Sequence, residues 1–238
     1  MATVAAAPYS GDQRFFSRMA IGIAIFILFG FAQFAARGFV NYQTAPFWVH
    51  LHGLFFISWV TLFVVQNVLA ERGAIGLHRK LGWLAVAVAA VIVPLTSFTG
   101  IMAITLHRQP PFFTPPYFLA LTQVGAIFFG GMVAAAIIKR RQTEWHRRLM
   151  LSATVLVLEP AFGRTLPMPL LGAELGEAIA GVLQVAILGI AMLHDRKHRG
   201  AIHPALFWGA GAVIMAHVLV SLLSGSPVVI AVAERLGG

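Results

Sequence analysis

The sequence predicts an all-α protein: one polytopic bundle of seven transmembrane helices with its N-terminus in the cytoplasm. Two observations carry this prediction. Of the 238 residues, 59% are hydrophobic and only 11% are charged, and the mean hydropathy is +0.84. The apolar residues lie in long continuous runs, and most cations lie in short segments between them. A water-soluble domain of this composition could not cover its surface with polar side chains.

Seven of the apolar runs are long enough to cross the hydrocarbon layer, which takes about 20 helical residues. They are expected to form one domain, residues 1–238. The tail that follows them, 226–238, is too short to cross and is expected to lie at the membrane interface. In order, the predicted spans are residues 18–36, 47–70, 80–105, 117–138, 147–165, 170–193 and 204–224.

The segments between the spans predict their orientation. Basic residues precede the first span and recur in the second, fourth and sixth connections, ERGAIGLHRK, KRRQTEWHRR and DRKHRG. The third connection, RQPPFFTPP, is rich in proline and aromatic residues and predicts a stiff interfacial cap. Because cytoplasmic segments carry excess Lys and Arg, the C-terminus is expected outside. Of the 17 cations, the predicted cytoplasmic side holds all except Arg37, Arg108, Arg164 and Arg235.

Charge and composition exclude several classes of protein. The net charge of +9 is spread over these connections, which predicts contact with anionic lipid headgroups and no nucleic-acid partner. The absence of cysteine excludes disulfides, thiolate metal sites and iron–sulfur clusters. A retinal protein needs a lysine in its last span, but all three lysines lie at the predicted cytoplasmic edge. We expect a protein of a bacterial cytoplasmic (inner) membrane.

Polar residues within the spans are the candidate functional residues, because each is costly in lipid unless it faces protein, water or a ligand. In FWVHLHGLFFISWVTLFVVQ (47–66), His52, Trp59 and Gln66 are spaced seven residues apart. They share one helix face, which is expected to point into the bundle. His50 lies about 200° around the helix from His52, so the two cannot bind one metal from a regular helix.

Residues on other spans are expected at the same depth. At a rise of 1.5 Å per residue, His217 and Glu159 both lie about 20 Å above the cytoplasmic starts of their helices. His52 and Gln123 lie about 8–9 Å below the outer boundary. These residues therefore predict a polar site in the outer half of the bundle.

The favoured hypothesis for this site is a redox cofactor, b-type haem or a quinone, with a role in electron transfer. His52 and His217 are the candidate axial or metal ligands, and Trp59 and Gln123 would line the cofactor site. Glu159 is the candidate catalytic, proton-handling residue, and Arg164 the candidate partner of a propionate or other anion.

Three other functions stay open, and whether the chain is an enzyme is undecided. The polar layer would suit a non-catalytic accessory or assembly subunit that binds other membrane subunits. It would also suit a metal-dependent membrane enzyme with a metal ion on His52, His217 and Glu159, or a proton-linked transporter. A purely structural ion pair of Glu159 with Arg164 or Arg37 is also open.

A short repeat, H-x-x-L, begins three predicted helices at His78, His146 and His203. These residues are read as anchors to anionic lipid, and a second site on the cytoplasmic side is left open. Together with H-L-H-G at 50–53 and E-P-x-x-G-R at 159–164, they resemble uncharacterised families of bacterial multi-spanning inner-membrane proteins. The placement of span histidines also resembles the general plan of membrane b-type cytochromes, which implies haem ligation.

Overall fold

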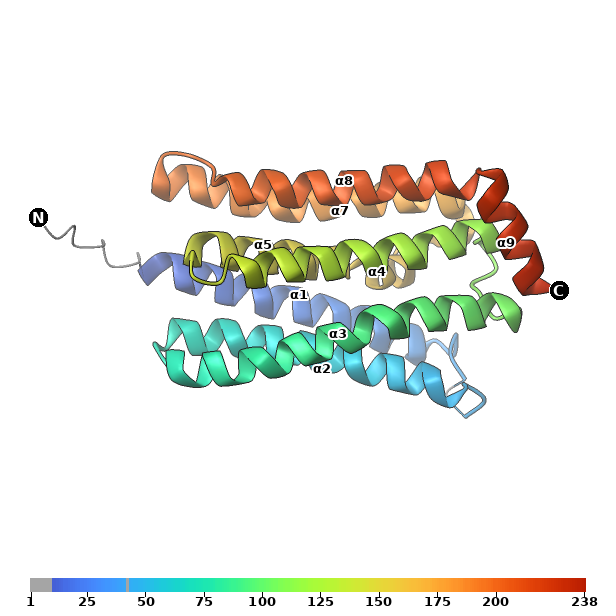
Figure 1. The fold of residues 1–238 in the computed structure, drawn as a ribbon, viewed down its shortest axis with the longest axis horizontal. Coiled ribbons are helices and arrows are strands. Elements are labelled where there is room, and N and C mark those ends of the chain that lie inside the picture. The colour runs from blue at the N-terminus through green and yellow to red at the C-terminus, as the bar shows by residue number, and fades with distance from the viewer. Residues whose placement is uncertain (1–9, 42) are drawn as a thin grey trace, which may run out of the picture.

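The computed structural model describes residues 10–41 and 43–238, and its regular secondary structure there is entirely helical (Figure 1). Residues 1–9 of the predicted domain lie outside the described residues. The long helices run along a common axis, and the last helix lies across one end of the bundle (Figure 1). The helices are α1 Ser10–Ala36, α2 Phe47–Glu71, α3 Ile75–Thr105, α4 Pro115–Ile138, α5 Thr143–Leu156, α6 Glu159–Thr165, α7 Met168–Arg199, α8 Pro204–Ser224 and α9 Pro227–Gly237.

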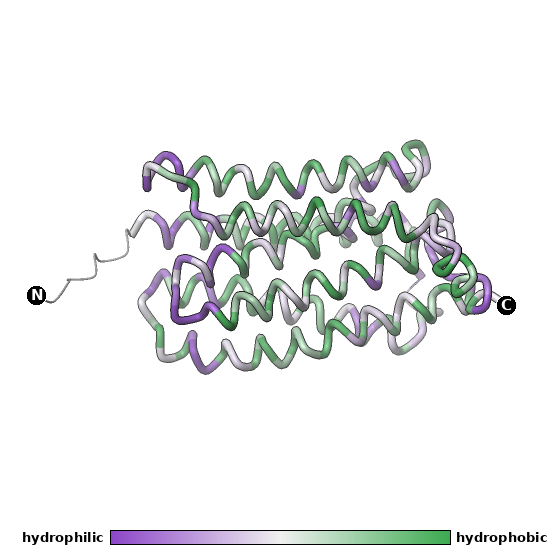
Figure 2. The backbone as a smooth tube through the Cα atoms, turned by 45° about the horizontal axis from the view of Figure 1, so that its top comes forward, coloured by the Kyte–Doolittle hydropathy of each residue, from purple (hydrophilic) through white to green (hydrophobic). Residues whose placement is uncertain are grey.

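Among the described residues, six helices are long and apolar enough to cross a membrane: α1, α2, α3, α4, α7 and α8. The protein is therefore a multi-pass membrane protein. Apolar residues fill the middle of the bundle, and hydrophilic residues lie mostly towards its ends (Figure 2). We call the end that holds the start of α1 and the connections 72–74, 139–142 and 200–203 the basic end.

The bounds of these six helices agree with the predicted spans, with three extensions. Helix α1 begins at Ser10, α3 begins at Ile75 and α7 continues to Arg199, so each extends beyond its predicted apolar span at the basic end. The predicted tail forms α9, which packs Ala233 against Ile104 of α3 and Leu119 of α4. The tail thus covers one end of the bundle.

The fifth predicted span, 147–165, is not one continuous helix. It is divided into α5 and the short α6, and Val157 and Leu158 lie between them. Pro160 accounts for the break, because proline has no N–H and its ring clashes with the carbonyl four residues earlier, that of Leu156.

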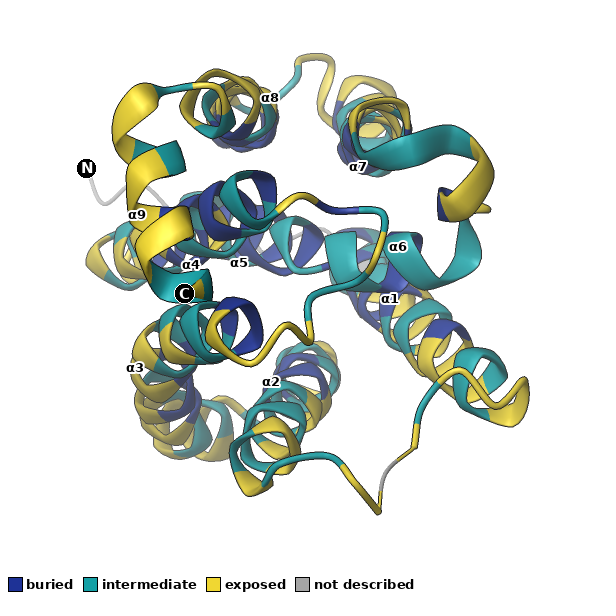
Figure 3. Cartoon of the chain, turned by 90° about the vertical axis from the view of Figure 1, so that its right-hand side faces the viewer, coloured by how far each residue is buried: buried dark blue, intermediate teal, exposed yellow. Residues whose placement is uncertain are grey.

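Helices α4 and α5 lie in the middle of the bundle when it is viewed along its long axis (Figure 3). Helices α7 and α8 lie on one side of them, and α2 and α3 lie on the other. Helix α5 is buried over most of its length, including the polar residues Arg147, Arg148, Ser152 and Thr154. Its polar side chains must therefore find partners on neighbouring helices.

Close packing of α5 against α8 requires a glycine at position 209. A Cβ atom added to Gly209 would lie 2.0 Å from the Oγ atom of Ser152. The backbone of α8 thus approaches the Ser152 side chain of α5 as closely as only a residue without a side chain allows.

We predict that Gly209→Ala destabilises the bundle by about 1–3 kcal/mol, because the added methyl group overpacks the α5–α8 contact. The matched control is Gly211→Ala in the same helix, where nothing lies within 4 Å of the added Cβ. Thermal unfolding of both variants in detergent measures the effect. Equal melting temperatures for the two variants would contradict the contact.

Candidate functional site

A chain of polar contacts begins where the central helix breaks. The break leaves the carbonyl of Leu156 without its usual partner within the helix. The Nε2 atom of Gln184, on α7, donates a hydrogen bond to that carbonyl at 3.3 Å. Gln184 is almost completely buried. The Gln184 side chain therefore replaces the hydrogen bond that Pro160 removes.

This contact fixes the hydrogen-bonding roles of the next residue, His217 of α8. Because the Gln184 amide nitrogen donates to Leu156, its Oε1 atom faces His217 Nε2, at 2.9 Å. An amide oxygen only accepts, so His217 Nε2 carries the hydrogen and Nδ1 holds the lone pair in the neutral ring. The ring packs directly on Gly181, where an added Cβ would lie 2.9 Å from Cδ2.

The free nitrogen of His217 faces a pair of carboxyl groups. Its Nδ1 atom lies 3.9 Å from Oε2 of Glu177, a residue of α7 that is 2% exposed. The Glu159 side chain, at the start of α6, interacts directly with that of Glu177. Neither Glu177 oxygen has a partner of good hydrogen-bond geometry among the described residues. We call Glu159, Glu177, Gln184 and His217 the acid cluster.

The candidate residues of α2 make no hydrogen bond to the acid cluster among the described residues, although His52 lies within electrostatic reach of Arg164, which also acts on Glu159. Trp59 and Gln66 are buried, as their shared face predicts. The Nδ1 atom of His52, the Nε1 atom of Trp59 and both polar side-chain atoms of Gln66 are buried without a hydrogen-bond partner among the described residues. Trp59 packs edge-on against Phe129 of α4, at 5.0 Å between ring centres.

The helices that carry His52 and His217 do not pack closely against each other. The two histidines belong to α2 and α8, and α4 and α5 lie between these helices (Figure 3). The arrangement therefore favours separate roles for the two histidines.

Gln123 and Arg164 have local partners. Gln123 of α4 accepts a hydrogen bond from the Ser97 hydroxyl of α3 at 2.6 Å and donates one to the Ser97 carbonyl at 3.3 Å. The Arg164 guanidinium donates to the carbonyl of Pro160 and lies over the Phe31 ring of α1, 4.1 Å from its centre. Both side chains therefore have structural contacts that a role in cofactor binding does not require.

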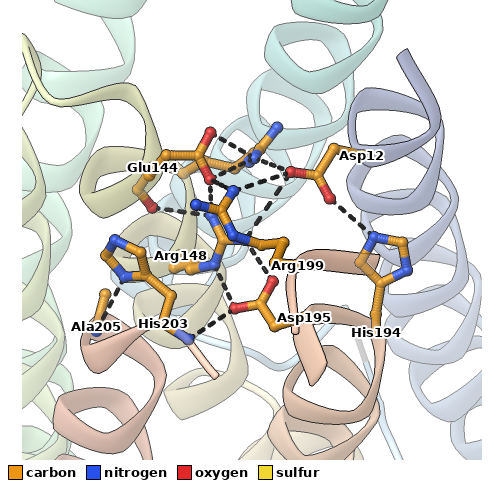
Figure 4. A network of polar contacts seen from close by, with 9 residues as sticks. Asp12, Glu144, Arg148, His194, Asp195, Arg199, His203 and Ala205 are labelled. Carbon is orange, nitrogen blue, oxygen red and sulfur yellow. Dashed lines mark hydrogen bonds and ion pairs between the residues drawn. The ribbon is translucent and has the colours of Figure 1, made fainter. Parts of the chain in front are cut away.

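A second cluster, at the basic end, joins α1, α5, α7 and α8 (Figure 4). Its centre is Arg148, which is fully buried and binds both oxygens of Asp195 through its Nε and Nη2 atoms. Two further carboxylates pair with neighbouring guanidinium groups: Asp12 pairs with Arg147, and Glu144 pairs with Arg148. The basic-end network comprises Asp12, Glu144, Arg147, Arg148, His194, Asp195, Arg199 and His203.

The charges of this network balance. Three guanidinium groups face three carboxylates, so ion pairing compensates the cost of burying each charge. Asp12 of α1 pairs with Arg147 at 2.6 Å and contacts His194 Nε2 at 2.8 Å. The ring of Phe16 lies beneath Arg147, 4.4 Å from its Cζ atom. The network thus ties the start of α1 to the end of α7.

Sequence reasoning missed most of these partners. Gln184 lies seven residues after Glu177, and this spacing places both on one face of α7, which is the signal that could have revealed it. Asp12 and Asp195 are the only two aspartates of the chain, and each lies beside a predicted basic segment. Comparisons of the chain with protein-family models, with curated proteins and with solved structures found no match.

We predict that Arg148→Met destabilises the protein by about 3–5 kcal/mol, because it leaves the buried Asp195 carboxylate without its cation. The control is Arg141→Met, a change at an exposed arginine of the nearby α4–α5 connection. Chemical or thermal unfolding in detergent compares the two. A loss no larger in Arg148→Met than in Arg141→Met would show that the pair adds no stability.

We also predict that His203 makes stability depend on pH. Its Nδ1 atom accepts the N–H of Ala205 and caps α8. Burial, together with Arg148 and Arg199, lowers the pKa of His203. The unfolded chain therefore binds this proton more readily, so stability is complete above the unfolded pKa of about 6.5 and is lost as pH falls below it.

His203→Asn tests this prediction, because asparagine also caps a helix but does not titrate in this range. The melting temperature of the variant is expected to fall less than that of the wild type between about pH 7.5 and about pH 5.5. Identical losses in the two proteins would contradict a role for His203.

Proposed function

We propose that the protein crosses a bacterial inner membrane seven times, with its N-terminus in the cytoplasm. Six crossings are the long apolar helices. Helices α5 and α6 would together form the remaining crossing, the fifth in sequence order, since they run from the basic end towards the opposite end (Figure 1). All but four of the 17 cations lie in the segments that define the basic end or in the helix turns that adjoin them. This distribution supports the cytoplasmic placement of the basic end. The acid cluster would then lie nearer the outer face.

We further propose that the acid cluster binds and releases a proton in a proton-linked transporter. The observation that carries this proposal is the meeting of two carboxyl groups and an imidazole inside an apolar bundle. Two adjacent carboxylates cannot both ionise at low cost away from water, and Arg164, which acts electrostatically on Glu159, offsets at most one of the two charges. The pair therefore retains a proton.

The contacts of His217 suit it to receive that proton. Its Nδ1 lone pair faces Glu177 Oε2 at 3.9 Å, a gap that one water or a small side-chain movement would bridge. Gln184 keeps the opposite nitrogen protonated through its contact with Nε2. Glu159 and Glu177 would hold the proton, His217 would accept it, and Gln184 would orient the ring.

Two interrupted helices next to the cluster support transport. The α5–α6 break adjoins Glu159, and α7 has a kink at Gly172, whose φ of 74° departs from helical geometry. Discontinuous helices at a site within the bilayer are typical of secondary transporters, which use them to bind ions and to change conformation. Proton binding at the junction of α6, α7 and α8 would thereby bias their packing.

Infrared spectroscopy tests whether the pair holds a proton. The wild type is expected to show the C=O stretching band of a protonated carboxyl at neutral pH, and Glu177→Gln is expected to remove or shift it. The control is Glu174→Gln, an exposed glutamate of the same helix. A wild type without such a band, or a band that survives Glu177→Gln unchanged, would refute proton storage.

Proteoliposomes with a pH-sensitive dye inside test the coupling. Glu177→Gln is expected to slow proton movement at least about tenfold, because proton transfer through a placed acid is lost. Gly181→Ala should also slow it, since the added methyl group displaces His217 without removing a titratable group. Glu174→Gln should keep the wild-type rate. Failure of the wild type to move protons faster than empty vesicles would reject the transporter function.

A further inference from the structure

His78 and His146 occupy equivalent positions in the two H-x-x-L segments that begin α3 and α5. Each ring bonds a backbone carbonyl at the end of the preceding helix: His78 Nδ1 lies 3.2 Å from Gln66 O, and His146 Nδ1 lies 2.8 Å from Ala136 O. The repeat is thus a structural one, with each histidine linking its own helix to the helix before it.

These bonds decide where the lone pair of each ring lies. A carbonyl oxygen only accepts, so Nδ1 donates and carries the hydrogen in both histidines. The neutral ring then presents the lone pair of Nε2, for which the described part of the chain supplies no hydrogen-bond partner. A ring nitrogen anchored to a backbone carbonyl opposite a free nitrogen is the arrangement of metal-binding histidines.

The two rings also lie at a suitable separation. Their centres are 6.4 Å apart and their planes are nearly perpendicular, at 89°. A metal bonded to two imidazole nitrogens at about 2 Å each places the ring centres about 6 Å apart when the nitrogens approach from opposite sides. The observed separation of the ring centres matches this distance.

A third polar group next to His78 lacks a partner. Gln66 is 9% exposed, and neither its Oε1 nor its Nε2 atom has a hydrogen-bond partner among the described residues. Its Nε2 lies 3.6 Å from the position of an added Cβ at Gly82, one turn along α3 from His78. An orphaned amide this deeply buried indicates a ligand nearby, because it would otherwise cost free energy.

We propose that His78 and His146 bind a transition-metal centre through their Nε2 atoms, with the Gln66 amide beside it. Neutral imidazoles suit ions such as Zn²⁺ and Cu²⁺, and they also suit the iron of haem. The third histidine of the repeat takes no part, since His203 caps α8 and packs edge-on against Trp145. The site is independent of the acid cluster, which shares none of its residues.

Untagged protein from cells supplied with a haem precursor and trace metals provides the test. We expect about one metal per chain by elemental analysis, and at least tenfold weaker binding of added Zn²⁺ or haem in His78→Ala and His146→Ala. A Soret band that these variants lose identifies haem iron, and bound metal without that band identifies a free ion. The control His50→Ala changes an exposed histidine at the opposite end and should bind as the wild type does.

A measurement on the wild type alone keeps the proposal testable if the variants do not fold. Diethyl pyrocarbonate modifies unprotonated histidine nitrogens, and mass spectrometry locates the modified rings. Metal or haem should protect His78 and His146 but not His50. The proposal is overturned by a wild type that binds neither Zn²⁺, Cu²⁺ nor haem, by protection of none of these residues, or by binding that survives the loss of both histidines.

Discussion

The break after Leu156 in the central helix is the constraint on which the polar arrangement of the bundle depends. A carbonyl left bare in an apolar interior must be paired, and Gln184 pairs it. At the other end of α5, Arg148 binds Asp195 of the same neighbouring helix. Helix α5 is thus tied to α7 at both ends, which holds a short and deeply buried helix in one register.

The polar groups at the two ends of α5 act in different ways. At the basic end, three guanidinium groups match three carboxylates, so full charges are compensated by full charges of opposite sign. In the acid cluster the partners of Glu177 are another carboxyl group and an imidazole, and one arginine, Arg164, acts electrostatically on Glu159. The first arrangement fixes the helices, whereas the second leaves a group that a single proton can change.

The sequence predicted the fold far better than the partners within the site. Continuous apolar runs located six membrane helices within a few residues at most ends, because burial in lipid requires length and hydrophobicity and little else. It also identified Glu159 and His217 as costly residues at a common depth. It could not pair them, since depth along a helix says nothing about rotation or about which helices are neighbours. His52 satisfied the same depth criterion but belongs to α2, which lies across α4 and α5 from α8.

The sequence by itself determined that the chain is helical, apolar and multi-pass, and that polar residues interrupt particular spans, because these properties follow from composition and local spacing. Only the tertiary structure decided that α4 and α5 separate α2 from α8, that Gln184 completes the broken helix, and that His78 meets His146. Such contacts join residues far apart in the chain, 68 positions for His78 and His146 and 182 for Asp12 and His194. Helix packing brings them together, and no local pattern in the chain encodes that packing.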